Sequence, residues 1–228
     1  MIELSKITKT FNMGKSNAFD ALKSIDLRIQ MGRMTVFKGP SGSGKTTLLS
    51  IIGCMSRPTS GRIMVQGLET TSLPERFAGG IRRKTFGFIF QDYQLIRGIT
   101  VLENVMIPTY PTGRKHRMVK KQAEDLLGRL HMASKVHEKV ENLSGGERQR
   151  VAISRALIND PAVIIADEPT AHLDTELSRQ FMALMISFKE EGKTILIASH
   201  DPLVSGYGGV DRVVGLRDGE IIENGAGK

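Results

Sequence analysis

A glycine-rich run of eight residues, 39–46, restricts this chain to a narrow group of folds. Its sequence, Gly39-Pro40-Ser41-Gly42-Ser43-Gly44-Lys45-Thr46, fits the phosphate-loop pattern G-x-x-x-x-G-K-[ST]. The run follows a short apolar strand predicted at 34–37 and precedes a helix predicted from Gly44 to about Ile52, which is the context that such a loop requires. A chance match in a chain of this length and of ordinary composition has odds of about 1 in 100. The sequence therefore predicts a loop that wraps a phosphate group.

Each residue type in this loop has a physical task. Glycines let backbone N–H groups turn inward around an anion, and the helix N-terminus adds the positive end of its dipole. Lys45 is placed to reach the β- and γ-phosphates of a nucleotide, and Thr46 to offer its hydroxyl to Mg²⁺. A plain glycine turn is the alternative, and it accounts for neither the strand before the loop nor the helix after it.

Composition and charge narrow the class of protein further. The 228 residues are 40% hydrophobic and 25% charged, which is close to the globular average and predicts a folded body with a core. The longest stretch without a charged residue, 46–56, has eleven residues, whereas a membrane-spanning helix needs about 20. The first residues show no export signal, so we expect a cytoplasmic protein. The single cysteine, Cys54, cannot form an internal disulfide and is interpreted as inert core.

Helices and apolar strands alternate along the chain and predict an α/β fold with a parallel sheet. Strands are predicted at 61–66, 163–166 and 194–199, and a helix at 144–157. A further helix carries the apolar stripe Leu177, Phe181, Leu184, Met185 and Phe188. Segments 213–216 and 220–222 flank Arg217-Asp218-Gly219 and predict a hairpin that extends the sheet with antiparallel strands.

Between Pro74 and Leu143 the pattern becomes mainly helical. Residues 100–103 form a capping box, and Ala123, Leu126, Leu127 and Leu130 recur at helical spacing. We expect one domain in which a helical subdomain, approximately 91–159, is inserted into a core of approximately 1–90 and 160–228.

A basic run, Arg114-Lys115-His116-Arg117-Met118-Val119-Lys120-Lys121, lies within this helical region. The net charge of the chain is +8, but it is spread along the sequence, and a solvated basic face is the simplest interpretation. The run contains no aromatic residues to stack on bases, which argues against single-stranded nucleic acid. We expect this run to open a surface helix.

Two adjacent carboxylates, Asp167 and Glu168, follow the buried strand 163–166 at its C-terminal end, where open α/β sheets bind their ligands. Asp167 is predicted to hold Mg²⁺ beside Thr46. Glu168 is predicted to orient and deprotonate the water that attacks the γ-phosphate. Acids at a strand end are more often helix caps or solvated turn residues. Because a phosphate loop lies upstream in the same chain, a nucleotide site is the favoured interpretation of Asp167 and Glu168 here.

The run 143–150, Leu143-Ser144-Gly145-Gly146-Glu147-Arg148-Gln149-Arg150, is the most specific string in the chain. Ser144 as an N-cap followed by two glycines exposes bare N–H groups at a helix start, which is a second anion site. One nucleotide cannot occupy both loops of a single subunit. A head-to-tail dimer, in which the Ser144 loop of each subunit closes over the Lys45 loop of the other, uses both loops and creates two composite sites.

The order of these motifs resembles that of ATP-binding-cassette (ABC) ATPases over essentially the whole chain. Residues 39–46 resemble the Walker A loop, Gln91 the Q-loop glutamine, 143–149 the ABC signature, and 163–168 the Walker B strand with the catalytic glutamate. Leu173-Asp174 resembles the D-loop and His200 the switch histidine.

The resemblance implies that ATP and Mg²⁺ bind, with Mg²⁺ held by Thr46, Gln91 and Asp167. It implies catalytic roles for Glu168, His200, Gln91 and Lys45, and a role for Asp174 in communication across the dimer. The nucleotide contacts that it implies come from Phe11, Gly39, Pro40, Ser41, Gly42, Ser43, Gly44, Lys45, Thr46 and Thr47. The signature contacts acting in trans come from Ser144, Gly145, Gly146 and Glu147.

A narrower resemblance is to the ATPases of the lipoprotein-release, macrolide-export and cell-division group. It is carried by 86–91 and 100–105, and it implies a P-loop NTPase parallel sheet core with an antiparallel β extension and an inserted α-helical subdomain. The chain departs from the family pattern at Phe11, where a tyrosine often stacks on adenine, and at Ala171-His172, which replaces Gly-Asn or Ser-Ala.

Two hypotheses for function share all of these motifs. In the first, two copies of the chain hydrolyse ATP and energise a separate transmembrane permease-type subunit, so that the protein is peripheral on the inner face of the cell membrane. In the second, the same clamp regulates a cell-envelope enzyme or sensor without transport. A chromosome or DNA-repair ATPase is disfavoured, because the roughly 100 residues between Lys45 and Ser144 show no sustained heptads. No nucleic-acid partner is expected.

The segment after Gln91 is predicted to dock the membrane partner. It carries four apolar side chains around Arg97-Gly98, namely Tyr93, Leu95, Ile96 and Ile99. An exposed apolar patch of this kind needs a partner to cover it. The alternative is that these side chains fold under the helical subdomain as local core.

Overall fold

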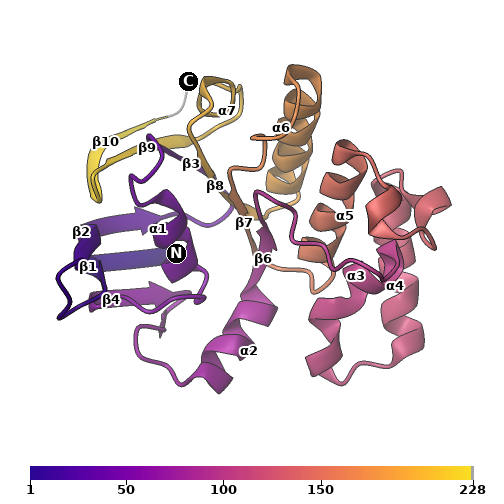
Figure 1. Ribbon diagram of the computed structural model, residues 1–228, viewed down its shortest axis with the longest axis horizontal. Helices are drawn as coiled ribbons and strands as arrows, with labels where there is room; N and C mark the ends of the chain where they lie inside the picture. Colours follow the sequence, from indigo (N-terminus) through magenta and orange to yellow (C-terminus); the bar gives the residue numbers. More distant parts are fainter. Residues whose placement is uncertain (227–228) are drawn as a thin grey trace.

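A six-stranded sheet forms the centre of the computed structural model, which describes residues 1–226 (Figure 1). Its order is β10-β9-β3-β8-β7-β6, and every neighbouring pair is parallel except β9 with β10. The helices on both faces bury it, as a parallel sheet requires. This sheet confirms the predicted α/β fold. Its strands are β3 (Met34–Lys38), β6 (Phe86–Ile89), β7 (Val163–Asp167), β8 (Thr194–Ser199), β9 (Arg212–Arg217) and β10 (Glu220–Ala226).

A second sheet is antiparallel and has the order β2-β1-β4-β5. Along β2 the side chains of Ile25, Leu27 and Ile29 alternate into the core. Ser24 has a φ of +49° and the pairing register shifts there, so the preceding buried residue is Leu22 and not residue 23. Its strands are β1 (Ile2–Phe11), β2 (Phe19–Ile29), β4 (Ser60–Val65) and β5 (Leu68–Glu69).

Helix α1 (Lys45–Ile52) lies between the two sheets. Its buried Leu48 and Ile52 belong to the same apolar cluster as Ile7 of the antiparallel sheet and Phe37 of the parallel sheet. The other face of the parallel sheet is covered by a second cluster from two later helices, α5 (Gly145–Leu157) and α6 (Thr175–Glu190). The short helix α7 (Pro202–Ser205) follows β8 and adds Val204 to this second cluster.

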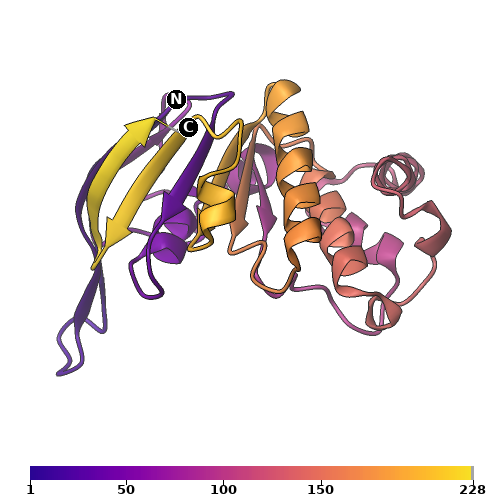
Figure 2. The same ribbon diagram turned by 90° about the horizontal axis from the view of Figure 1, so that it is seen from above.

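The inserted helices gather at the opposite end of the molecule from the antiparallel sheet (Figures 1 and 2). They are α3 (Val101–Met106), a 3₁₀ helix (Ile107–Thr112), α4 (His116–Arg129) and α5. A third cluster holds them together and includes Val105, Ala123, Leu127 and Val151. Helix α5 contributes Ile153 and Leu157 to the sheet cluster as well, so it joins the inserted helices to the sheet.

The segment 91–100, which leads into α3, is held by buried polar groups. Asn104 is fully buried: its Oδ1 accepts from Ile96 N at 2.8 Å, and its Nδ2 donates to Ile96 O at 3.0 Å and Thr100 O at 3.1 Å. Tyr93 and Gln94 have left-handed φ values of 58° and 46°. The half-buried Arg155 of α5 donates to the backbone oxygens of both residues, at 2.6 Å and 2.5 Å. These bonds fix a conformation that isolated residues rarely adopt.

One expectation from the sequence is incomplete and another is wrong. The stretch 74–143 is mainly helical, as predicted, but it also contains a strand that the sequence did not predict: after α2 (Glu75–Thr85) the chain forms β6 at the edge of the parallel sheet, paired with β7. Gly87 permits this strand to lie against α5, since a Cβ there would be 2.3 Å from Ala156 O. The predicted C-terminal hairpin exists, but its first strand runs parallel to β3 and only β10 is antiparallel. Both differences arise from pairing between strands that are distant in sequence.

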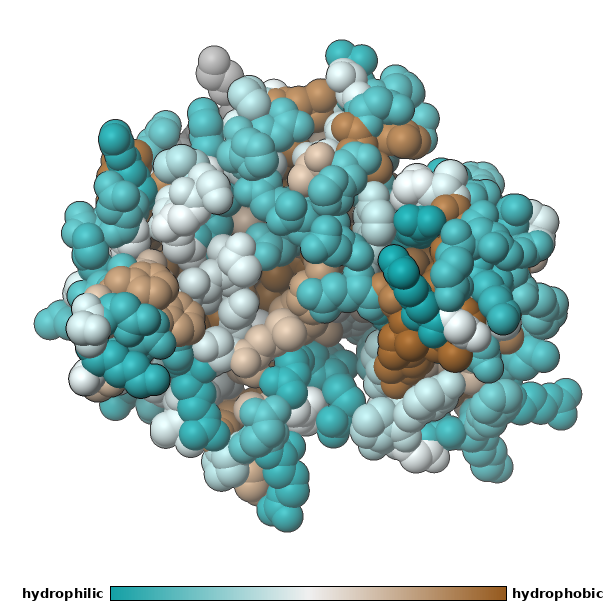
Figure 3. Space-filling view, in the orientation of Figure 1, coloured by the Kyte–Doolittle hydropathy of each residue, from teal (hydrophilic) through white to brown (hydrophobic). Residues whose placement is uncertain are grey.

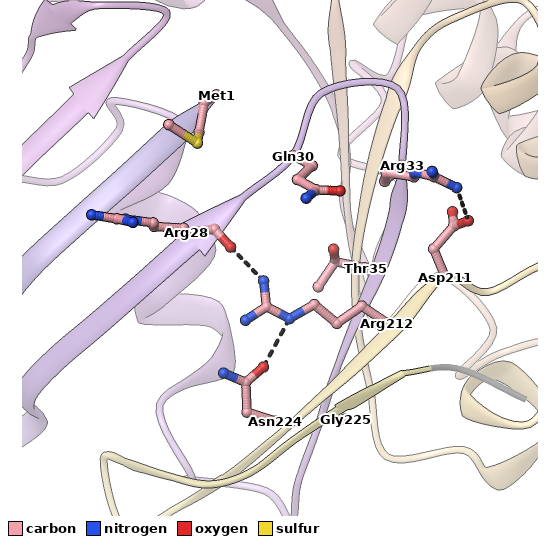
Figure 4. Close-up of a pocket in the computed structure, with 9 residues that line it drawn as sticks. All are labelled: Met1, Arg28, Gln30, Arg33, Thr35, Asp211, Arg212, Asn224 and Gly225. Atoms are coloured by element: carbon pink, nitrogen blue, oxygen red, sulfur yellow. Dashed lines mark hydrogen bonds and ion pairs between the residues drawn. The ribbon is translucent and has the colours of Figure 1, made fainter.

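A cavity of about 650 Å³ lies where the two sheets diverge, at the N-terminal ends of the parallel strands (Figure 4). Arg212 of β9 spans it: its guanidinium donates to Arg28 O of β2, and its Nε donates to Asn224 Oδ1 of β10 at 2.8 Å. Arg33 bonds to Asp211 Oδ1 at 3.0 Å. Arg212 and Arg33 are therefore bound to oxygens of the protein itself, and the cavity is a junction between the sheets.

No helix within residues 1–226 has the length and apolar character needed to cross a membrane.

Candidate nucleotide site

The glycine-rich loop lies at the C-terminal end of β3 and leads into α1, as predicted. Gly42 and Gly44 have left-handed φ values of 79° and 101°. A Cβ at Gly44 would lie 2.5 Å from Ala21 O, and a Cβ at Gly39 would lie 2.2 Å from Leu216 O. The backbone of the loop therefore approaches its neighbours too closely for any side chain at these positions.

Lys45 is the central cation of the site. Its side chain is only 5% exposed, and its Nζ donates to Gly39 O at 2.7 Å and Pro40 O at 3.0 Å. The same Nζ lies 3.3 Å from Glu168 Oε1, which comes from the end of β7. The loop therefore holds a buried positive charge directly beside the acid that the sequence predicts as the catalytic base.

The two adjacent acids at the end of β7 have different partners. Asp167 Oδ1 accepts a hydrogen bond from Thr46 Oγ1 at 3.1 Å, although the two residues are 121 positions apart. Burial raises the pKa of Asp167, while the Thr46 hydroxyl lowers it and the charge of Glu168 raises it further. A hydroxyl and a carboxylate side by side are the oxygen ligands that suit Mg²⁺.

Glu168 lies between Lys45 and His200. Its Oε2 is 2.9 Å from His200 Nδ1 and accepts from the His200 backbone N–H at 3.3 Å. Glu168 has a left-handed φ of 44°, and its own N–H donates to Ala198 O at 2.9 Å. A non-glycine residue in this region is strained, and such strain is concentrated at functional sites.

Lys45, Thr46, Glu168 and His200 line a cavity of about 330 Å³ together with two aromatic rings and Gln91. Asp167 lines a neighbouring cavity, which Thr46 and Gln91 also line. Phe11 and Phe19, which are paired across the turn between β1 and β2, are stacked with centroids 5.5 Å apart. Lys9 Nζ lies 5.1 Å from the centroid of the Phe11 ring. The lining residues are Phe11, Phe19, Ala21, Ser41, Gly42, Ser43, Gly44, Lys45, Thr46, Thr47, Gln91, Glu168 and His200.

The loop fits a phosphate in one further respect. The hydroxyl of Ser43 is buried and has no hydrogen-bond partner among the described residues. An orphaned polar atom in a glycine loop beside a buried lysine is accounted for by an anionic ligand. The residues present therefore fit a nucleotide phosphate chain.

The signature loop begins α5 with Ser144 as the predicted N-cap, in a capping box with Glu147. Ser144 N donates to Glu147 Oε2 at 2.8 Å, and Glu147 N donates to Ser144 Oγ at 3.3 Å. The hydrogen bond from the Ser144 backbone N–H lowers the pKa of Glu147. Within residues 1–226 none of the four predicted signature contacts lines the nucleotide cavity. The structure therefore keeps the two anion sites of the chain apart.

The D-loop residue Asp174 caps helix α6, because its Oδ1 accepts from Leu177 N at 2.8 Å. The neighbouring His172 reaches across to the segment after Gln91, where its Nε2 lies 3.2 Å from Asp92 Oδ1. A role of Asp174 in communication between subunits stays a prediction. The contact between His172 and Asp92 links the D-loop to the Q-loop within one chain.

Three site residues were not predicted from the sequence. Phe19 is not among the predicted residues. Its place opposite Phe11, across the turn 12–18, could have indicated that the two rings lie together. Asp92 and Arg155 were missed because their partners are 80 and about 61 positions away, and no local pattern reports such contacts. Gln149 of the signature run has no role that the sequence predicts, but it is buried and its Nε2 donates to Pro169 O at 2.9 Å.

A parallel sheet with a glycine loop, a buried lysine and two acids at its carboxyl edge defines a P-loop nucleotide-hydrolysing protein. The ABC transporter family model matches residues 22–171. The chain belongs to this family and is an ATP-binding and ATP-hydrolysing cassette.

Individual relatives agree with this assignment. The chain is 42% identical over its whole length to the macrolide export ATP-binding/permease protein MacB of Bartonella henselae, of which it spans 34%. It is 39% identical to the uncharacterized ABC transporter ATP-binding protein YknY of Bacillus subtilis and spans 98% of that protein. Among solved structures, the dimeric bacterial ABC transporter cassette MJ0796 has a TM-score of 0.91 and 38% identity, covering 99% of this chain and 98% of that one.

Proposed function

We propose that two copies of this chain bind two MgATP at their shared interface and use hydrolysis to drive a separate membrane-embedded permease-type subunit. The observation that carries the proposal is the arrangement of Lys45, Glu168 and His200 within one cavity from which Ser144 is absent. A complete hydrolytic site needs donors on both sides of the γ-phosphate, and one chain places donors on one side only.

Within one subunit the residues divide the chemistry. The N–H groups of 41–46 and the Lys45 ammonium bind the phosphates, and the stacked rings of Phe11 and Phe19 offer the adenine a face. A Mg²⁺ ion would be held by Thr46, Asp167 and Gln91 and would neutralise charge on the β- and γ-phosphates.

Glu168 takes the proton from the attacking water. The oxygen of that water then bonds to the γ-phosphorus, and the bond from the γ-phosphorus to the β–γ bridging oxygen breaks, which leaves ADP and phosphate. His200 Nδ1 lies 2.9 Å from Glu168 Oε2, and Lys45 Nζ lies 3.3 Å from Glu168 Oε1. These two contacts hold the carboxylate of Glu168 in position to accept the proton.

The dimer completes the site. In a head-to-tail pair, the Ser144 hydroxyl and the N–H groups of Gly145 and Gly146 reach the γ-phosphate held by the other subunit. The relative MJ0796 has been solved as a dimer, and a post-hydrolysis dimer of it has been solved with ADP and Pi, which supports this arrangement.

Two observations support a membrane partner: the names of the relatives and the exposure of Ile96 in the segment 91–100. The MacB relatives are named as combined ATP-binding and permease proteins, and the chain spans about a third of their length. In the segment 91–100, Ile96 is 51% exposed, while Tyr93, Leu95 and Ile99 are half-buried and Leu95 packs on the cluster of α3 to α5. We therefore place the docking contact at Ile96 and not at Leu95.

Replacing Glu168 with Gln tests the core of the proposal. The variant removes the base but keeps Lys45 and Asp167, so MgATP binding is retained and turnover falls by at least about 100-fold. Size-exclusion chromatography with MgATP is expected to show a stable dimer. A variant that stays monomeric and turns over ATP like the parent would refute both the base and the dimer.

A mixing experiment separates trans from cis action of the signature loop. Ser144→Arg is expected to bind ATP as the parent does and to lose hydrolysis, whereas Lys45→Ala loses binding. A mixed dimer of the two inactive variants retains one intact composite site and recovers partial turnover. Loss of ATP binding by monomeric Ser144→Arg would show that Ser144 acts on the nucleotide of its own subunit.

A further inference from the structure

The turn that leads into α4 carries an uncompensated positive charge. Between Glu103 and Glu124 the sequence has five basic residues and no acidic one. Of these five side chains only Lys120 has an acidic partner, Glu124 at 3.8 Å, among the described residues. Arg114 bonds to the neutral Gln122. The five residues are Arg114, Lys115, Arg117, Lys120 and Lys121.

This charge does not serve the stability of α4. Lys115 is the N-cap and makes no capping hydrogen bond, and the first turn contains no acidic residue. Cations at the N-terminus of a helix are opposed by the positive end of the helix dipole. Helix α4 is attached to the protein by its opposite face, through the buried Val119, Ala123 and Leu127. Apart from the bond of Arg114 to Gln122 and the ion pair of Lys120 with Glu124, these basic side chains make no polar contact among the described residues that offsets their mutual repulsion.

Two large apolar side chains flank the charges. Tyr110, at the end of the 3₁₀ helix, is 61% exposed, and Met118, in the first turns of α4, is 62% exposed. The lower right corner of the molecule, where the 3₁₀ helix turns into α4 in Figure 1, is mainly hydrophilic in the space-filling view (Figure 3). A basic surface that also presents a tyrosine and a methionine has the composition of a segment that rests on the headgroups of a bilayer.

We propose that this basic turn, residues 110–121, lies directly against an anionic membrane surface. Its charge is complementary to anionic headgroups, and each Lys or Arg near such a surface strengthens binding about fivefold. Tyr110 and Met118 enter the interfacial layer, where an apolar side chain is favourable. A nucleic acid fits less well, because Tyr110 is the single aromatic side chain of residues 110–121, whereas single-stranded sites stack successive bases on several rings, and a phosphate backbone makes no use of Met118.

This contact is independent of the permease proposed above, since it involves lipid alone. Vesicles contain no permease, so failure of lipid binding leaves the proposed function untouched, and failure of the proposed function leaves lipid binding untouched.

Co-sedimentation with vesicles tests the proposal. The whole chain is mixed with vesicles of phosphatidylcholine with and without phosphatidylglycerol, and bound protein is measured at increasing salt. We expect binding only to the vesicles with phosphatidylglycerol, and a roughly 100-fold loss of that binding in a triple variant, at about fivefold for each charge. The triple variant is Lys115→Gln, Arg117→Gln and Lys121→Gln.

A matched control changes the same net charge elsewhere on the exposed surface. Its substitutions are Lys6→Gln, Lys15→Gln and Lys84→Gln. The control keeps vesicle binding, and both triple variants keep parental ATP turnover, which shows that they fold. Equal vesicle binding by the parent and the basic-turn variant, or equal loss in the control, would overturn the proposal.

The apolar contribution distinguishes a membrane from a soluble polyanion. Met118→Ser is expected to weaken vesicle binding most clearly at high salt, where charge is screened, and to leave binding to heparin unchanged. Parental binding to duplex DNA or heparin together with no binding to vesicles would assign the basic turn to a polyanion and refute the membrane contact.

Discussion

At the scale of single residues, the site is held in an arrangement that opposes folding. Asp167 is partly buried next to a second carboxylate, which raises its pKa, and Glu168 adopts a left-handed backbone. Burial of like charges and strained dihedrals reduce stability, and proteins retain them where function requires them.

Replacing Asp167 with Asn is therefore expected to stabilise the protein and to abolish Mg²⁺-dependent turnover. Because the folded-state pKa of Asp167 is raised, its ionisation lowers the free energy of unfolding as pH rises through that pKa. The Asn variant lacks this loss, and its amide oxygen still accepts from Thr46. We expect a Tm increase on the order of 2 °C near neutral pH. The increase shrinks as pH falls through the raised pKa of Asp167, because the parent protein then takes up a proton and loses the unfavourable charge. A lower Tm at neutral pH would contradict this account.

Phe19 is expected to take part in nucleotide binding through its stack on Phe11. Since an aromatic pair contributes about 0.5–1.5 kcal/mol, Phe19→Ala should weaken ATP binding by roughly 2- to 12-fold. Fluorescence titration with an ATP analogue measures the change. Phe77→Ala removes an equally exposed ring outside the site and should leave the affinity unchanged.

The glycine loop and the two acids were predictable from the sequence because each depends on neighbours along the chain. His200 was identified only through resemblance to a family, since a histidine after a buried strand has no local signature. The contact between His172 and Asp92 could not be predicted, because the fold alone brings the two loops together.

At the scale of elements, helix α5 connects most parts of the site. It begins at the signature loop, its Gln149 bonds to the segment after Glu168, and its Arg155 holds the backbone after Gln91. A movement of α5 would therefore displace the signature loop, the segment after Glu168 and the backbone after Gln91 at the same time.

Gln149→Leu is expected to destabilise the protein by about 1–3 kcal/mol, because it leaves the buried Pro169 O without a donor. That corresponds to a Tm decrease of roughly 2–12 °C for a chain of this size. Thermal unfolding measures it, with the exposed Gln180→Leu as the control. Equal Tm values for both variants would show that the bond to Pro169 contributes nothing.

Elements with strong local signals were predicted closely, and those defined by distant pairing were not. The helices α1, α5 and α6 have glycine or polar ends and apolar stripes, and their observed bounds lie within about two residues of expectation. Strand β6 has four residues and no turn signal, so its apolar run reveals a strand only when β7 is beside it. The direction of β9 is set by β3, which lies about 180 residues earlier.

At the scale of the whole molecule, the nucleotide site and the segment proposed to dock a partner adjoin each other, because Gln91 lines the nucleotide cavity and 93–99 follow it. Only five positions of the sequence therefore separate Gln91, which lines the nucleotide cavity, from Ile96, where the partner is proposed to dock. A partner bound at Ile96, as proposed, would be connected to the nucleotide cavity through the backbone between Gln91 and Ile96.

Ile96→Glu is expected to reduce co-purification with the membrane fraction while ATP turnover by the isolated chain is unchanged. Leu95→Glu provides the contrast: its side chain packs on the cluster of α3 to α5, so a charge there should lower Tm and cause aggregation. The comparison is made in the Lys115→Gln, Arg117→Gln, Lys121→Gln background, which removes the proposed lipid contact. If Ile96→Glu stays with the membrane fraction there as that background variant does, the docking contact lies elsewhere.

The buried amide of Asn104 has a mechanical consequence. It bonds to Ile96 twice and to Thr100, while Arg155 fixes Tyr93 and Gln94, so the stretch from Tyr93 to Thr100 moves with the inserted helices as one stiff arm. Asp92, just before this arm, is held from the other side by the D-loop, where His172 Nε2 lies 3.2 Å from Asp92 Oδ1. A displacement of Ile96 would therefore be passed to the inserted helices through Asn104 and Arg155 and to the D-loop through Asp92, and little of it would be absorbed as bending.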